Sequence, residues 1–271
     1  MAVPSFLSGA FSHTLLSACT DVQAIMDQMS ADLVGLGWTQ TVGVSGDTTQ
    51  EFTTPVGATA AEFFVVNCVR ISATDLQVII TDGFGQLFCY PTHSHIYIDA
   101  LGTNVSVFGG VDVPYFMISA NRATPESIAA WQTDKYPDAH GNPMPRWVCL
   151  PCRTSAGALS SNNWANCLFK SPADTSYSTV VSYYLWRQWY AASGTAQSTF
   201  SGAMLVHPIE YQADGYWMGR LPNALLIDDS YSIFSEYVIP IDYDGVTFTT
   251  GTFRVIAEAV QFEQRMAIRV A

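Results

Sequence analysis

Cysteine and histidine side chains are the first candidates for chemistry in this sequence, because both bind transition metals. Two cysteines form a C-x-x-C pair at Cys149 and Cys152. A structural zinc site usually takes two such pairs, or one pair and a close histidine pair. The candidate ligands are Cys149, Cys152, Cys167, His93, His95 and His140. One C-x-x-C without a second pair at fixed spacing falls short of a zinc motif, so the sequence predicts no metal and no other cofactor.

The same residues have alternative uses. Cys149, Cys152 and Cys167 could form disulfides, within the chain or to neighbouring subunits, if the mature protein is located outside a cell. His93 and His95 are two residues apart in a predicted strand and therefore share one face. We expect that pair to belong to the polar face of an antiparallel sheet.

Motifs for catalysis are absent from the sequence. It contains no G-x-S-x-G, no P-loop, no G-x-G-x-x-G and no H-E-x-x-H. Asp228 and Asp229 are adjacent carboxylates, and Asp242 and Asp244 precede a glycine in a pattern typical of a turn. We therefore expect no enzymatic activity, with a metal-dependent hydrolase as the alternative.

Aromatic side chains are concentrated in residues 183–190, with the sequence YYLWRQWY. On a strand they would occupy both faces, which is typical of a central strand buried on both sides. Exposed Trp and Tyr side chains instead mark protein interfaces or stack on sugars. The candidates for an interface or a glycan site are Trp164, Trp186, Trp189, Tyr190 and Trp217.

Charged residues are scarce in this chain. They make up 13% of 271 residues, about half of the usual share, while apolar residues make up 49%. Lysine occurs only at Lys135 and Lys170, which argues against nucleic-acid binding. No apolar run is long enough to predict a membrane span, and the apolar N-terminal segment lacks the positive region of a signal peptide. Low charge with abundant aromatics is typical of subunits that bury surface against neighbours.

One amphipathic helix is predicted near the N-terminus. It begins at Thr20, with Gln23 at capping-box spacing, and apolar residues recur at steps of three and four until Gly35 and Gly37. Trp38 follows directly, and we expect it to fasten the helix to a sheet.

After Trp38 the apolar period changes to two, which predicts antiparallel strands in a sandwich or barrel. A second short helix is predicted over residues 124–133, where Thr124, Pro125 and Glu126 suit a helix start. We expect three parts: residues 1–133 with the first helix and strands, a Pro-, Gly- and Ser-rich loop insertion over 134–175, and strands over 176–271 that complete the same core. A division near Asp134 into two β units is the alternative.

Several short motifs add a resemblance. The first helix ends in Gly37-Trp38, and the closing part contains 219–224 (GRLPNA), 228–229 (DD), 253–255 (FRV) and 265–269 (RMAIR). Over residues 20–80 and 215–271 the chain resembles a loose group of virion structural proteins of tailed bacteriophages.

That resemblance implies a structural subunit of the tail, neck or baseplate, or an accessory of the capsid. It implies a protein that is assembled in the host cytoplasm and acts through protein–protein interfaces. Its partners would be other virion proteins, in a homo- or hetero-oligomer. A glycan- or host-receptor-binding module of a virion is the alternative that the aromatic candidates leave open.

Overall fold

The computed structural model describes residues 10–55, 64–82, 95–111, 115–123, 126–132, 147–150, 166–170, 178–181, 207–213, 216–228, 231–243, 248–259 and 264–271. The chain divides into two compact units, of which the first is Gly9–Ser182 and the second contains Tyr183–Ala271. All described strand pairs are antiparallel, which confirms the predicted mainly β fold. No helix in these described ranges is long and apolar enough to cross a bilayer.

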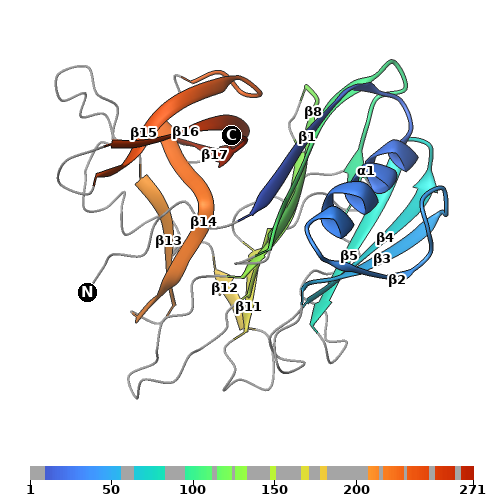
Figure 1. The fold of residues 1–271 in the computed structure, drawn as a ribbon, viewed down its shortest axis with the longest axis horizontal. Helices are drawn as coiled ribbons and strands as arrows, with labels where there is room; N and C mark the ends of the chain where they lie inside the picture. The colour runs from blue at the N-terminus through green and yellow to red at the C-terminus, as the bar shows by residue number, and fades with distance from the viewer. Residues whose placement is uncertain are drawn as a thin grey trace. The chain divides into compact units, whose positions relative to one another are not determined.

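The first unit contains two antiparallel sheets (Figure 1). The seven-stranded sheet has the order β1 (Phe11–Cys19), β7 (Thr103–Gly110), β8 (Tyr115–Asn121), β9 (Glu126–Gln132), β10 (Trp147–Leu150), β11 (Asn166–Lys170) and β12 (Ser178–Val181). The five-stranded sheet has the order β2 (Thr39–Val42), β3 (Thr49–Thr53), β4 (Phe64–Ser72), β5 (Asp75–Asp82) and β6 (His95–Tyr97). Strands β10 and β11 fall within residues 134–175, where the sequence predicts a loop insertion.

Helix α1 (Val22–Gly35) lies between these two sheets (Figure 1). It contacts β1 and β7 of one sheet and β2, β3 and β4 of the other, whereas β6 reaches β8 and β9 directly. The buried face of α1 is the predicted one: Val22, Ile25, Met26, Met29 and Leu33. Burying each such side chain stabilises the fold by about 1.5–3 kcal/mol.

At its first end α1 differs from the prediction, and at its second end it agrees with the prediction. The N-cap is Asp21, not Thr20, and its side chain accepts a hydrogen bond from the backbone N–H of Gln23 at 2.9 Å. Trp38 fastens the helix as predicted, since its Nε1 donates to the carbonyl of Gly110 at 3.0 Å and its ring meets Phe64 edge-on.

The second predicted helix, over residues 124–133, is wrong. Residues Glu126–Gln132 form β9, which pairs with β8 so that Ile128 lies opposite Ile118. Ile128, Ala129 and Ala130 are all buried, so the strand lacks the alternation of apolar and polar residues that would have revealed it. Pairing with β8 overrides a local preference for helix, which is only a weak prior.

Another difference concerns the N-terminal segment. Residues Phe11–Cys19 form β1, the strand at one edge of the seven-stranded sheet, in antiparallel register with β7. From the sequence, this apolar stretch suggested only a possible signal peptide, and no strand was predicted there. Successive side chains of β1 point to opposite faces of the sheet. One face carries Ser12, Thr14 and Leu16, which lie opposite residues of β7 that face α1. The other face carries Phe11, His13 and Leu15.

The second unit contains one five-stranded sheet with the order β13 (His207–Ala213), β14 (Tyr216–Asp228), β17 (Gln264–Arg269), β16 (Phe248–Ala259) and β15 (Glu236–Tyr243). Strands β16 and β17 pair as antiparallel neighbours, with Arg254 opposite Ile268. The core of this sheet is Leu225, Ile227, Ile239, Phe253, Val255 and Ala267. Arg254 is buried and forms an ion pair with Glu236.

A glycine substitution tests the packing of the seven-stranded sheet. A Cβ at Gly110 would lie 2.2 Å from Cε1 of the buried Tyr115 ring, so we expect Gly110→Ala to lower the free energy of unfolding by about 1–3 kcal/mol. Gly35→Ala is the matched control, because no heavy atom lies within 4 Å of that Cβ and alanine favours a helix by up to about 1 kcal/mol. Urea unfolding measures both, and equal losses would contradict the close approach at Gly110.

Candidate functional site

Five chain connections meet where α1 begins, and we call this region the turn end. It comprises residues 18–21, 43–48, 71–74, 98–102 and 122–123. Backbone hydrogen bonds join these connections: Val22 N–H donates to the Ala73 carbonyl at 2.8 Å, and Ile98 N–H donates to the Thr74 carbonyl at 3.1 Å. The loop between β2 and β3 joins them because Arg70 N–H donates to the Thr48 carbonyl at 2.9 Å.

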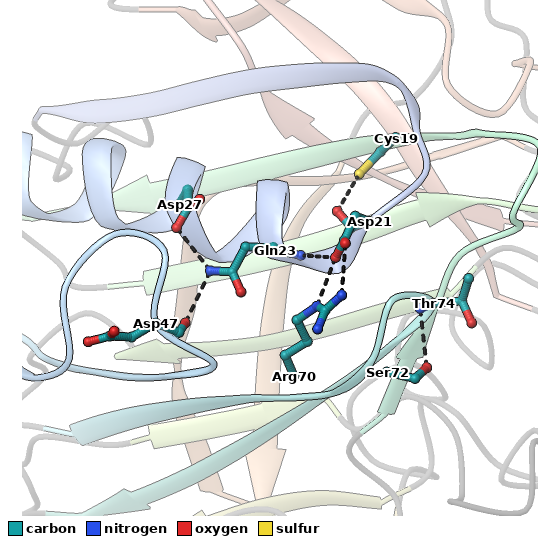
Figure 2. A network of polar contacts seen from close by, with 8 residues as sticks. All are labelled: Cys19, Asp21, Gln23, Asp27, Asp47, Arg70, Ser72 and Thr74. Carbon is teal, nitrogen blue, oxygen red and sulfur yellow. Dashed lines mark hydrogen bonds and ion pairs between the residues drawn. The ribbon is translucent and has the colours of Figure 1, made fainter.

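A two-pronged ion pair fixes the start of α1 to β4 (Figure 2). Nε of Arg70 donates to Oδ1 of Asp21 and Nη2 donates to Oδ2, both at 2.9 Å. The guanidinium holds the pKa of the Asp21 carboxyl below its ordinary value, and the carboxylate raises the pKa of Arg70. Asp21 therefore caps the helix and is also the counter-ion of Arg70 on β4.

Asp27 fastens the loop between β2 and β3 to the same helix, and Figure 2 shows Gln23 bonded both to Asp27 and to the backbone carbonyl of Asp47. Its Oδ1 accepts from the backbone N–H of Gly46 at 2.8 Å, and from the side-chain amides of Gln23 and Gln50 at 3.1 Å each. Gln23 also donates to the backbone carbonyl of Asp47. Burial alone would raise the pKa of Asp27, but these donors lower it below its ordinary value.

A third group of charges connects β6, β8 and β9. Arg122 donates to Asp99 at 3.0 Å and to the buried carboxylate of Glu126, whose other oxygen accepts from Tyr97 N–H at 2.9 Å. Burial alone would lower the pKa of Arg122, but the two carboxylates raise it. The described arginines of this region, Arg70 and Arg122, are thus both engaged within the unit.

Large apolar side chains project into solvent from the connections of the turn end. Leu101 is 98% exposed, Val44 is 65% exposed and Ile71 is 54% exposed. The backbone that carries Leu101 is constrained, because Gly102 has φ +109° and its Cβ position lies 3.1 Å from Ala18. Three exposed apolar side chains on adjoining, hydrogen-bonded connections are typical of a surface that contacts another protein.

His95 lies in a separate internal network. Its Nδ1 is 2.8 Å from Oδ1 of Asp75, its Nε2 is 3.3 Å from the Gln77 amide, and its ring stacks on Tyr97. The ring is buried and both nitrogens have partners, so binding of a metal would require breaking this network. His93, the other member of the predicted pair, lies outside the described residues.

Of the other predicted site residues, three lie on described strands. Cys149 lies on β10 and Cys167 on the neighbouring β11, where Cys149 is opposite Leu168 in the register. Trp217 is placed as a position on β14. Outside the described residues lie Cys152, His140, Trp164, Trp186, Trp189 and Tyr190. Within the parts of the chain that the structure describes, no three His, Cys, Asp or Glu side chains are grouped to hold a metal. The glycan and metal-site hypotheses stay predictions.

The turn end was not predicted from the sequence. Asp21 is one residue from the predicted cap, so its capping role was within reach of a sequence argument. Its pairing with Arg70 was not, because 49 residues separate the two side chains. The exposure of Leu101 and Ile71 depends on the placement of the turns.

The sequence matches no protein-family model and no curated protein. Function is therefore inferred from the geometry of the turn end and from the composition of the chain.

Two substitutions at Asp21 test how the turn end is held. Asp21→Ala removes the helix cap and the ion pair, so we expect it to lower the free energy of unfolding at neutral pH by about 1–2 kcal/mol. Asp21→Asn keeps an acceptor for Gln23 and should lose less. Because the folded pKa is lowered, the ion pair stabilises fully above the ordinary pKa of 3.8 and is lost as pH falls through the folded value.

Denaturant unfolding over a range of pH measures these effects. The wild type and Asp21→Asn should differ at neutral pH and converge in acid. A difference that is constant over the whole range would show that the Arg70 ion pair contributes nothing to stability.

Proposed function

We propose that this chain is a structural subunit of a bacteriophage particle, in the tail, neck or baseplate, and that it works through protein–protein contacts made by the turn end. The observation that carries the proposal is the exposure of Leu101, Val44 and Ile71 on connections that hydrogen bonds and ion pairs hold in place. The choice of a phage particle is supported by the resemblance in sequence.

The distribution of charge supports a role in assembly. The chain has 11 basic and 23 acidic residues, and at the turn end Arg70 and Arg122 are bonded to carboxylates of the same unit. A partner that contacts Leu101 therefore does not have to desolvate a free arginine there. Apolar contact at the centre of an interface is the usual source of its binding free energy.

Rigidity supports the same proposal. Association loses free energy when loops become ordered on binding. The connections of the turn end are already fixed by Asp21, Asp27 and Arg122, so this cost is small. Partners would be other virion proteins, including further copies of the chain.

Incorporation into particles tests the proposal. In particles produced by cells that express the chain together with the rest of its genome, quantitative mass spectrometry should find the wild-type chain in a fixed ratio to the other virion proteins. The double substitution Leu101→Asp and Ile71→Asp should reduce its incorporation by about tenfold or more, because losing about 1.4 kcal/mol of contact free energy is a tenfold effect.

The control is Val238→Asp, an exposed valine on β15 of the second unit, which is 70% exposed. All three side chains are solvent-exposed, so each variant should retain the wild-type melting temperature. Particles that lack the wild-type chain would overturn the phage assignment. Equal incorporation of the wild type and the double variant would overturn the role of the turn end.

A further inference from the structure

Asp32 is the one acid on α1 that faces the edge strand β1. Its Oδ1 accepts from the Gln28 amide at 2.8 Å and from the Thr14 hydroxyl of β1 at 3.3 Å. Its Oδ2 is buried and has no hydrogen-bond partner among the described residues. The Ser12 hydroxyl, two residues before Thr14 on β1, is likewise buried without a partner in this part of the chain.

No cation neutralises Asp32 within the described ranges. The ionisable groups on α1 and on the strands packed against it are Asp27, His13, Cys19, Glu51, Cys68 and Arg70. Asp27 bonds to the loop between β2 and β3, and Arg70 bonds to Asp21. Glu51 bonds to Thr41.

The remaining groups face elsewhere. His13 is on the opposite face of β1, where it contacts Ser106 and Phe108. Cys19 lies at the far end of β1, and Cys68 contacts Met29. Asp32 is therefore an isolated carboxyl in an otherwise neutral seam between α1 and β1.

We propose that Asp32 makes the seam between α1 and β1 a pH-sensitive latch, which holds β1 more tightly when the carboxyl is protonated than when it is ionised. An ionised Asp32 carries part of its charge on a buried oxygen, Oδ2, that no donor contacts among the described residues, and burying such a charge is costly. It also places that charge in the last turn of α1, where the helix dipole is unfavourable for an anion. Protonation removes both penalties.

The direction of the pH dependence follows from the surroundings of the carboxyl. Burial raises the pKa of Asp32 above its ordinary value of 3.8, although the bonds from Gln28 and Thr14 oppose the shift. The folded state therefore keeps this proton at a pH where the unfolded chain has lost it. Stability falls as pH rises from the ordinary pKa to the folded pKa, and is constant above it.

Strand β1 is the element that this latch affects most. It is the edge strand of its sheet, so within the described strands only β7 pairs with it, while α1 packs on its face. Local opening is favoured at such edges, where fewer contacts hold an element. Ionisation of Asp32 thus loosens β1 before it affects the central strands.

Hydrogen exchange of the full-length chain tests the latch. After correction for intrinsic exchange, the protection of β1 amides in the wild type should fall as pH rises from the ordinary pKa of 3.8 to the raised folded pKa of Asp32, by about tenfold for each pH unit between the two. In Asp32→Asn the β1 protection should not vary over this range and should exceed the wild-type value at neutral pH.

The matched control is Asp27→Asn on the same helix. Three donors stabilise the Asp27 carboxylate, so this substitution should lower the melting temperature at neutral pH, whereas Asp32→Asn should raise it. A second measurement, the carboxyl ¹³C titration of Asp32 in the wild type, does not depend on any variant. A titration midpoint at or below 3.8, or the same pH dependence of β1 protection in Asp32→Asn, would overturn the proposal.

Discussion

The first unit depends on the burial of one helix between two sheets. Each of the two sheets has an apolar inner face, and among the described strands they meet where β6 contacts β8 and β9 and where the Phe64 ring of β4 contacts the Phe116 ring of β8. The apolar face of α1 packs between β1 and β7 of one sheet and β2, β3 and β4 of the other. The strands on both sides are therefore positioned by the helix, and the helix is positioned by the residues at its two ends. Trp38 fastens one end to Gly110, and Asp21 fastens the other to Arg70.

The acids of this helix show how the same side chain acquires three different roles. Asp21 has a cationic partner and caps the helix, so its charge stabilises the fold. Asp27 has three neutral donors on one oxygen, which stabilise its charge without a cation. Asp32 has two neutral donors and a buried second oxygen, so its charge is a cost. The differences arise from what β1, β4 and the loop before β3 place opposite each residue.

Much of the fold was predictable because it is written in local patterns. The period of three and four residues marked the buried face of α1, and the period of two marked β3, β4 and β5. The prediction failed at β9, where Thr124, Pro125 and Glu126 suit a helix start and the run of buried residues from Ile128 to Ala130 shows no alternation. The pairing of Asp21 with Arg70, and the meeting of five connections at one end, follow from the antiparallel order of the sheets. A sequence that matches no family model gives no direct access to that order.

The scarcity of charge and the arrangement of the turn end are physically connected. A chain with few ionic residues can form few ion pairs that fix its loops. In the first unit, the described arginines form such ion pairs at the start of α1 and at the connection after β6. Because these charged side chains are bonded within the unit, the exposed side chains at the tips of those loops are apolar ones such as Leu101 and Ile71. Such tips are poorly solvated, and they are also held in place before any partner arrives. Both properties favour association, because apolar burial supplies the binding free energy and fixed loops lose little conformational entropy.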